Sequence, residues 1–168
     1  MIAFVVPVLA HQKTMTLPRE VMVILDNEYT GWSLVDNFSV LREPVLSHLN
    51  LNTSKSHPNL VWGDFDGDGK RDYAVFVERK TASGEERLLV AFLRRSNSFQ
   101  MHLLERAVYL AYIADYIWLA GKGSRQYDHE RRRYFRLEHD GIEAVVIEKA
   151  SVTYIFQSGR FQRIITTD

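Results

Sequence analysis

An acidic segment that contains two glycines, residues 64–72, constrains this chain more than any other feature. It reads Asp64-Phe-Asp-Gly-Asp-Gly-Lys-Arg-Asp72, so carboxylates recur at alternating positions and close the segment. Like charges this close repel one another unless a positive charge lies among them. Glycine readily adopts the positive φ values of tight turns. The segment therefore predicts a loop that folds around a hard cation with a preference for oxygen.

Calcium is the cation that fits such a loop best, because it accepts about six to eight oxygen ligands in flexible geometry. Alternating residues of a tight loop can point toward one centre. We expect Asp64, Asp66 and Asp68 to supply three carboxylates, Asp72 a fourth, and the main-chain carbonyl of Lys70 a further oxygen. The site is expected to be structural, since four carboxylates leave little open coordination for a substrate.

The loop differs from a helix-loop-helix calcium site. Such a site needs a bidentate glutamate at the twelfth loop position, and Val75 stands there instead. The segment Trp62-Gly-Asp-Phe-Asp-Gly-Asp-Gly-Lys-Arg-Asp-Tyr-Ala-Val75 resembles the calcium loop of the FG-GAP and VCBS repeat families. That resemblance implies a structural ion between two strands. It also implies that the ligands are the residues named above: Asp64, Asp66, Asp68, Asp72 and the carbonyl of Lys70.

The resemblance has limits along the rest of the chain. The loop occurs once, and Val77-Glu78-Arg79 stands where the repeat families usually have Gly-Ala-Pro, so we expect no propeller. The chain is closer to small exported bacterial proteins of unassigned function that carry a single such loop. Their tail pattern looks like three segments of this chain: Asp140-Gly-Ile-Glu, Glu148-Lys-Ala-Ser and Gly159-Arg-Phe.

Composition limits the class of protein. The 168 residues are 46% hydrophobic, which suits one domain with a real core. Basic and acidic residues number 21 each, so net charge does not favour nucleic acid, and none is expected as a partner. The absence of cysteine excludes disulfides and zinc-thiolate sites.

The N-terminus resembles a targeting segment. Residues 2–9 are apolar apart from Pro7, and Val8-Leu9-Ala10 suits a signal-peptidase site. We interpret residues 1–10 as a truncated signal peptide, with a buried N-terminal strand as the alternative. No other apolar run approaches the roughly 20 residues that span a bilayer, so no transmembrane segment is expected. This interpretation places a single β-rich domain, residues 11–168, in the periplasm or outside the cell.

Hydrophobic patterning predicts an α+β fold that is rich in mostly antiparallel strands. One N-terminal helix is expected over residues 17–29, with Thr16 as its cap and Gly31 as its stop. A loop is expected over residues 42–59, and tight turns between later segments favour antiparallel pairing. The predicted strands are residues 59–63, 73–77, 87–93, 99–103, 114–119, 134–137, 142–147, 151–156 and 161–165.

Other candidate sites are weaker. Asp64-Phe-Asp-Gly also resembles the first motif of haloacid-dehalogenase phosphatases, but Asp68 replaces the usual threonine and a strand is expected to follow. The histidines form no metal-type pair on a helix. The basic segment 125–136 carries Arg131-Arg132-Arg133, and it is either the solvated end of a hairpin or a surface for an acidic partner.

Three functions follow from these patterns. The first is an exported, calcium-stabilised binding or interaction domain that recognises a protein or polysaccharide of the cell envelope. The second is an inhibitor or immunity-type protein that acts on a partner enzyme. The third, a metal-dependent hydrolase, requires an open metal position beside a general base.

Overall fold

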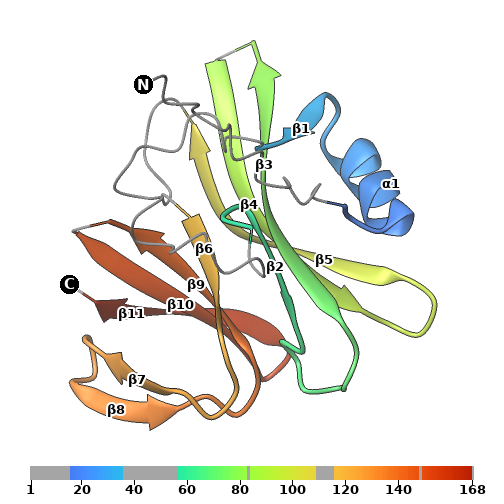
Figure 1. Ribbon diagram of the computed structural model, residues 1–168. Coiled ribbons are helices and arrows are strands. Elements are labelled where there is room, and N and C mark those ends of the chain that lie inside the picture. Colours follow the sequence, from blue (N-terminus) through green and yellow to red (C-terminus); the bar gives the residue numbers. More distant parts are fainter. Residues whose placement is uncertain (1–15, 36–56, 83, 109–115, 148, 168) are drawn as a thin grey trace, which may run out of the picture.

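The computed structural model describes residues 16–35, 57–82, 84–108, 116–147 and 149–167. Within these residues the chain forms two larger antiparallel sheets, a two-stranded sheet and one helix (Figure 1). Every pairing between named strands is antiparallel. The prediction of a β-rich chain with antiparallel strands and an N-terminal helix is confirmed in this part of the molecule.

The first sheet has the order β1-β3-β4-β5, and β2 also pairs with β3. Its strands are β1 (Trp32–Leu34), β2 (Leu60–Gly63), β3 (Asp72–Thr81), β4 (Gly84–Arg94) and β5 (Phe99–Val108). β2 and β1 pair with successive parts of β3, since Leu60 lies opposite Val75 and Leu34 lies opposite Val77. The almost continuously apolar β4 lies between β3 and β5.

The second sheet has the order β11-β10-β9-β6, and β7 and β8 pair separately. The strands are β6 (Tyr116–Ala120), β7 (Arg125–Asp128), β8 (Arg133–Arg136), β9 (Gly141–Val146), β10 (Ala150–Gln157) and β11 (Arg160–Thr167). Ser158 and Gly159 join β10 to β11 with φ values of 53° and 79°. Two positive φ values at a two-residue turn match the twist of the flanking strands, and β10 and β11 pair as a hairpin.

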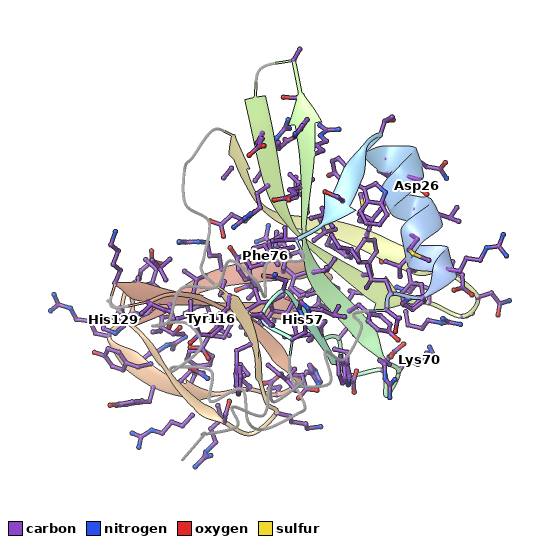
Figure 2. All side chains as sticks on the ribbon, turned by 45° about the horizontal axis from the view of Figure 1, so that its top comes forward. Asp26, His57, Lys70, Phe76, Tyr116 and His129 are labelled. Atoms are coloured by element: carbon purple, nitrogen blue, oxygen red, sulfur yellow. The ribbon has the colours of Figure 1, made fainter. Side chains whose placement is uncertain are left out.

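Two apolar cores separate three layers. Residues of both larger sheets form the first core, and Phe76 lies within it (Figure 2). The second core lies on the opposite face of the first sheet, where the helix α1 (Arg19–Glu28) buries Val21 and Leu25. Alternation along β3 explains this division, because successive strand residues point to opposite faces. Val75 and Val77 join the helix-side core, while Phe76 joins the core between the sheets.

The helix is shorter than the predicted 17–29, and its predicted cap is wrong. Pro18 occupies the N-cap position, and no side chain of the described residues caps the first turn, so Thr16 does not act as the cap. Proline is compatible with a helix start because its missing N–H would have no helical partner. Gly31 follows the helix end with a φ of 75°, consistent with its predicted role as a stop.

Other predicted elements agree in type but differ in length. β3, β4 and β5 extend beyond the predicted strands, and β6 ends at Ala120 rather than at residue 119. The proposed targeting segment, most of the predicted loop 42–59 and residues 114–115 lie outside the described residues. Among the helices described, none is long and apolar enough to cross a membrane.

Candidate metal centre

The acidic segment forms the loop that joins β2 to β3. Gly63 and Asp72 face each other at the ends of the two strands, so the intervening residues 64–71 must reverse the chain direction. In this loop Asp64, Asp66 and Asp72 each bring one carboxylate oxygen within 4.8 Å of the other two. Three hard oxygen donors so close together are a suitable ligand set for a divalent cation.

The two glycines shape the loop as the sequence predicts. Gly67 and Gly69 have φ values of 78° and 79°, which side chains other than glycine rarely adopt. The turned backbone directs its N–H groups at the carboxylates. Gly69 N–H donates to Asp64 Oδ2 at 3.1 Å, and Asp68 N–H donates to Asp66 Oδ1 at 3.3 Å. These bonds hold the carboxylates of Asp64 and Asp66 in place before any ion binds.

Asp72 is the most deeply buried carboxylate of the segment, with 0% exposure. Its two oxygens accept hydrogen bonds from the backbone N–H of Phe65 at 2.8 Å and of Arg94 at 2.7 Å. Burial raises the pKa of Asp72 to about 6; nearby Asp66 and Asp68 add to the rise, while the two backbone bonds oppose it. Because it accepts from Arg94 at the end of β4, Asp72 links the loop to that strand.

This raised pKa predicts how stability depends on pH. The folded state favours the protonated form of Asp72. The stability that this preference contributes is therefore fully present below the ordinary pKa of 3.8 and is lost as pH rises through about 6. We expect the unfolding free energy of the wild type, relative to Asp72→Asn, to fall over that window. Urea denaturation in chelator at several pH values measures the difference. Parallel pH profiles for the two proteins would refute the assignment to Asp72.

Two cationic side chains of the chain itself lie against the loop. Arg95 Nη1 forms an ion pair with Asp66 Oδ2, and Lys70 Nζ lies 2.7 Å from Asp68 Oδ2. The side-chain and backbone hydrogen bonds from Lys70 lower the pKa of Asp68. Lys70 lies at the tip of the loop, away from the sheets (Figure 2). The repulsion among the carboxylates is therefore partly relieved by the charges of Arg95 and Lys70.

The structure brings together some of the predicted ligands but not all of them. Asp64, Asp66 and Asp72 are brought together, whereas the two oxygens of Asp68 accept from Lys70 N and Lys70 Nζ. Asp64 Oδ1 is buried and has no hydrogen-bond partner among the described residues. A buried carboxylate oxygen without a donor is costly unless a cation satisfies it, so this atom fits a metal ligand. Coordination by Asp68 and by the Lys70 carbonyl stays a prediction.

A second contact anchors the loop to the turn between β8 and β9. Asp64 N–H donates to Asp140 Oδ2 at 3.0 Å, and Asp140 N–H donates to the Asp64 carbonyl at 3.1 Å. The imidazole of His139 lies against Gly67, where a Cβ atom would approach it to 2.2 Å. Asp140 lies far from the loop in the sequence. Its contact with the loop spans 76 residues, and no local pattern signals it.

Comparison with known protein families, with curated proteins and with solved structures finds no match for this chain. The resemblance to the FG-GAP and VCBS loops rests on residues 62–75.

Proposed function

We propose that this chain is an exported binding or interaction domain stabilised by one calcium ion in the β2–β3 loop. The observation that carries the proposal is the convergence of Asp64, Asp66 and Asp72, with Asp64 Oδ1 buried and without a donor among the described residues. The proposed ligand atoms are carboxylate oxygens, which calcium prefers, whereas softer metals prefer nitrogen or sulfur ligands. Asp68 and the Lys70 carbonyl would complete the shell, as the resemblance implies.

A structural role for the ion is favoured by where its ligands lie. Asp72 begins β3 and accepts from Arg94 on β4, and the loop exchanges two hydrogen bonds with Asp140. An ion bound by the three carboxylates would therefore stabilise a loop that is hydrogen-bonded both to β4 and to the turn before β9 of the second sheet. Within the described residues, only carboxylates contribute to the cluster, and no histidine joins it. Both features favour stabilisation over hydrolysis.

The proposed partner is a protein or polysaccharide of the cell envelope, in keeping with the export predicted from residues 1–10. An inhibitor or immunity-type function is the second candidate. It is supported by the β7–β8 hairpin, where Arg132 and Arg133 are exposed and the Arg125 guanidinium lies 3.7 Å from the centre of the Tyr134 ring. A rigid, basic hairpin suits an acidic surface on a partner enzyme.

Calcium titration by calorimetry tests the proposed ion. We expect binding at one site per chain, lost in the double variant Asp64→Asn/Asp66→Asn and retained in Glu85→Gln, an exposed carboxylate on β4. Arg95→Gln should bind calcium about fivefold more tightly. The guanidinium of Arg95, which pairs with Asp66, repels a calcium ion by an energy on the order of 1 kcal/mol, and the substitution removes that repulsion. Equal calcium binding by the double variant would refute the site.

Asp68→Asn decides whether a fourth carboxylate takes part. Unchanged affinity would confine the site to the three clustered residues, whereas a clear loss would bring Asp68 into the coordination shell. Replacing calcium with magnesium gives a further arm of the same titration, because magnesium demands near-octahedral geometry and releases its water reluctantly. We expect the loop to prefer calcium.

A further inference from the structure

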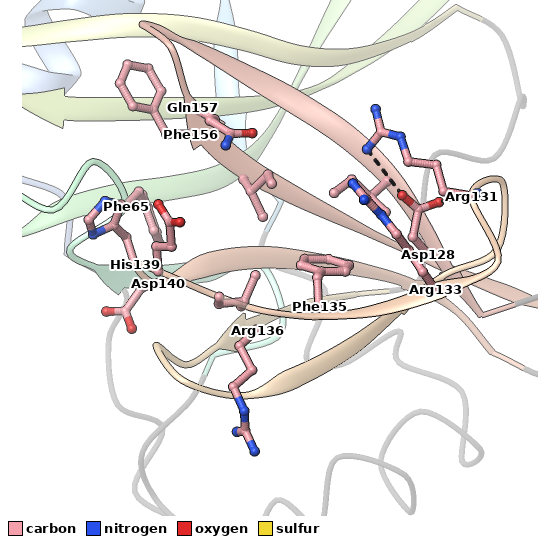
Figure 3. Close-up of a pocket in the computed structure, with 14 residues that line it drawn as sticks. Phe65, Asp128, Arg131, Arg133, Phe135, Arg136, His139, Asp140, Phe156 and Gln157 are labelled. Carbon is pink, nitrogen blue, oxygen red and sulfur yellow. Dashed lines mark hydrogen bonds and ion pairs between the residues drawn. The ribbon is translucent and has the colours of Figure 1, made fainter.

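A pocket lies between the β7–β8 hairpin and the second sheet, with a volume of about 170 Å³ (Figure 3). An engineered apolar cavity of about 150 Å³ accommodates benzene, so this pocket has room for one six-membered ring. Its apolar wall includes Phe65, Phe135, Leu137, Ile155 and Ile164. The pocket therefore combines the size and the lining that suit the body of a small aromatic molecule.

The hairpin is held over the outer face of the second sheet. His129 N–H, directly after β7, donates to the carbonyl of Ile165 on β11 at 3.0 Å. Tyr154 joins the core between the two larger sheets, so the adjacent Ile155 points to the opposite face of β10. Ile155 lines the pocket, which places the pocket on that outer face. Its walls are thus set by strand pairing and by the anchored hairpin.

One end of the pocket has an excess of positive charge. Asp128 and Arg133 are opposite each other in the β7–β8 pair. Asp128 is buried, with 3% exposure, and accepts from Arg131 N at 2.9 Å and from Arg131 Nη1 at 3.2 Å. Arg133 makes no side-chain hydrogen bond or ion pair within the part of the chain that the structure describes. Two guanidinium groups thus accompany one carboxylate, and the charge of Arg133 is unmatched.

None of the other carboxylates that line the pocket forms an ion pair with Arg133 within the described residues. The two oxygens of Asp140 accept backbone N–H groups of Asp64 and Lys122, at 3.0 and 2.8 Å. Arg136 donates to the carbonyl of Gly123 and extends away from the hollow (Figure 3). Glu138 is exposed. An anionic group that enters beside Phe135 would meet Arg133 first.

We propose that this pocket binds a small aromatic carboxylate, with its ring against Phe135, Ile155 and Ile164 and its carboxylate at Arg133. A guanidinium offers paired N–H donors that match the two oxygens of a carboxylate. The apolar wall excludes water from the ring and gives affinity that a simple inorganic anion would not gain. None of the proposed calcium ligands lines this pocket, although Phe65 of the loop forms part of its apolar wall.

Titration of the full chain with benzoate, followed by amide shifts in nuclear magnetic resonance spectra, tests the proposal. Benzamide is the neutral analogue of the same shape, and acetate carries the charge without the ring. We expect benzoate to shift amides of residues 131–139 and 155–157 and to bind about tenfold more tightly than either control. Equal binding of benzamide, or no shift with benzoate at these residues, would overturn the proposal.

Substitutions of two neighbouring arginines test whether Arg133 binds the carboxylate of benzoate. Arg133→Gln should weaken benzoate binding by about tenfold, the effect of losing a charge-assisted contact. Arg132→Gln is the matched control, because Arg132 is an adjacent exposed arginine that does not line the pocket. Both side chains are exposed, so both variants should keep the wild-type amide spectrum. Equal benzoate affinity in the two variants would remove Arg133 from the site.

Discussion

Replacing Asp72 with alanine should lower the free energy of unfolding by about 3 kcal/mol, the largest effect of any single loop substitution. The Asp72 carboxylate accepts from the N–H groups of Phe65 and Arg94. Each buried donor left without an acceptor costs roughly 1–3 kcal/mol. Relief from burying the carboxylate offsets part of that loss, since burial raises its pKa. Urea denaturation of both proteins in chelator measures the net loss of unfolding free energy.

Two further variants make the Asp72 measurement specific. Asp72→Asn keeps one acceptor oxygen, so its loss should be intermediate between wild type and alanine. Asp68→Ala removes an exposed carboxylate whose pairing partner, Lys70, is also exposed, so it should change the unfolding free energy far less. Equal losses for Asp72→Ala and Asp68→Ala would show that the two backbone hydrogen bonds contribute little.

Gly67→Ala should have the second largest effect and lower the unfolding free energy by about 2 kcal/mol. A non-glycine residue with left-handed backbone geometry costs roughly 1–2 kcal/mol, and Gly67 has a φ of 78°. The added Cβ would also lie 2.2 Å from His139 Cε1, which forces the ring away. Chemical denaturation of the purified variant measures both contributions together.

Gly69 allows the two contributions to be separated. It has nearly the same φ, 79°, but an added Cβ would meet nothing within 4 Å. Gly69→Ala should therefore lose only the backbone part, about 1 kcal/mol. In a double-mutant cycle, His139→Ala should remove most of the extra cost of Gly67→Ala. If Gly67→Ala and Gly69→Ala lose the same amount, the ring of His139 does not restrict the loop.

Local patterns were enough to predict the central part of the fold. The apolar run of β4, the β-forming residues of β3 and the Ser158-Gly159 turn each specify their structure within a few residues. The carboxylate spacing with Gly67 and Gly69 likewise predicts a turned loop between two strands. These features depend on neighbours in the sequence, so the sequence alone could reveal them.

Features that depend on distant partners could not be predicted in this way. β1 has three residues, and its pairing with β3 depends on contacts with Val77, Glu78 and Arg79 far along the chain. Arg95 reaches Asp66 from the turn after β4, and Asp140 meets the loop from the turn that precedes β9 of the second sheet. Nothing in the spacing of these residues marks them as partners of the acidic loop.

The melting temperature as a function of calcium concentration tests the central claim most directly. An ion that binds only the folded chain stabilises it by mass action. We predict that the melting temperature rises with the logarithm of calcium concentration, and that Asp64→Asn/Asp66→Asn removes this rise. A wild-type melting temperature that is the same in millimolar calcium as in chelator would contradict a structural calcium ion held by Asp64, Asp66 and Asp72.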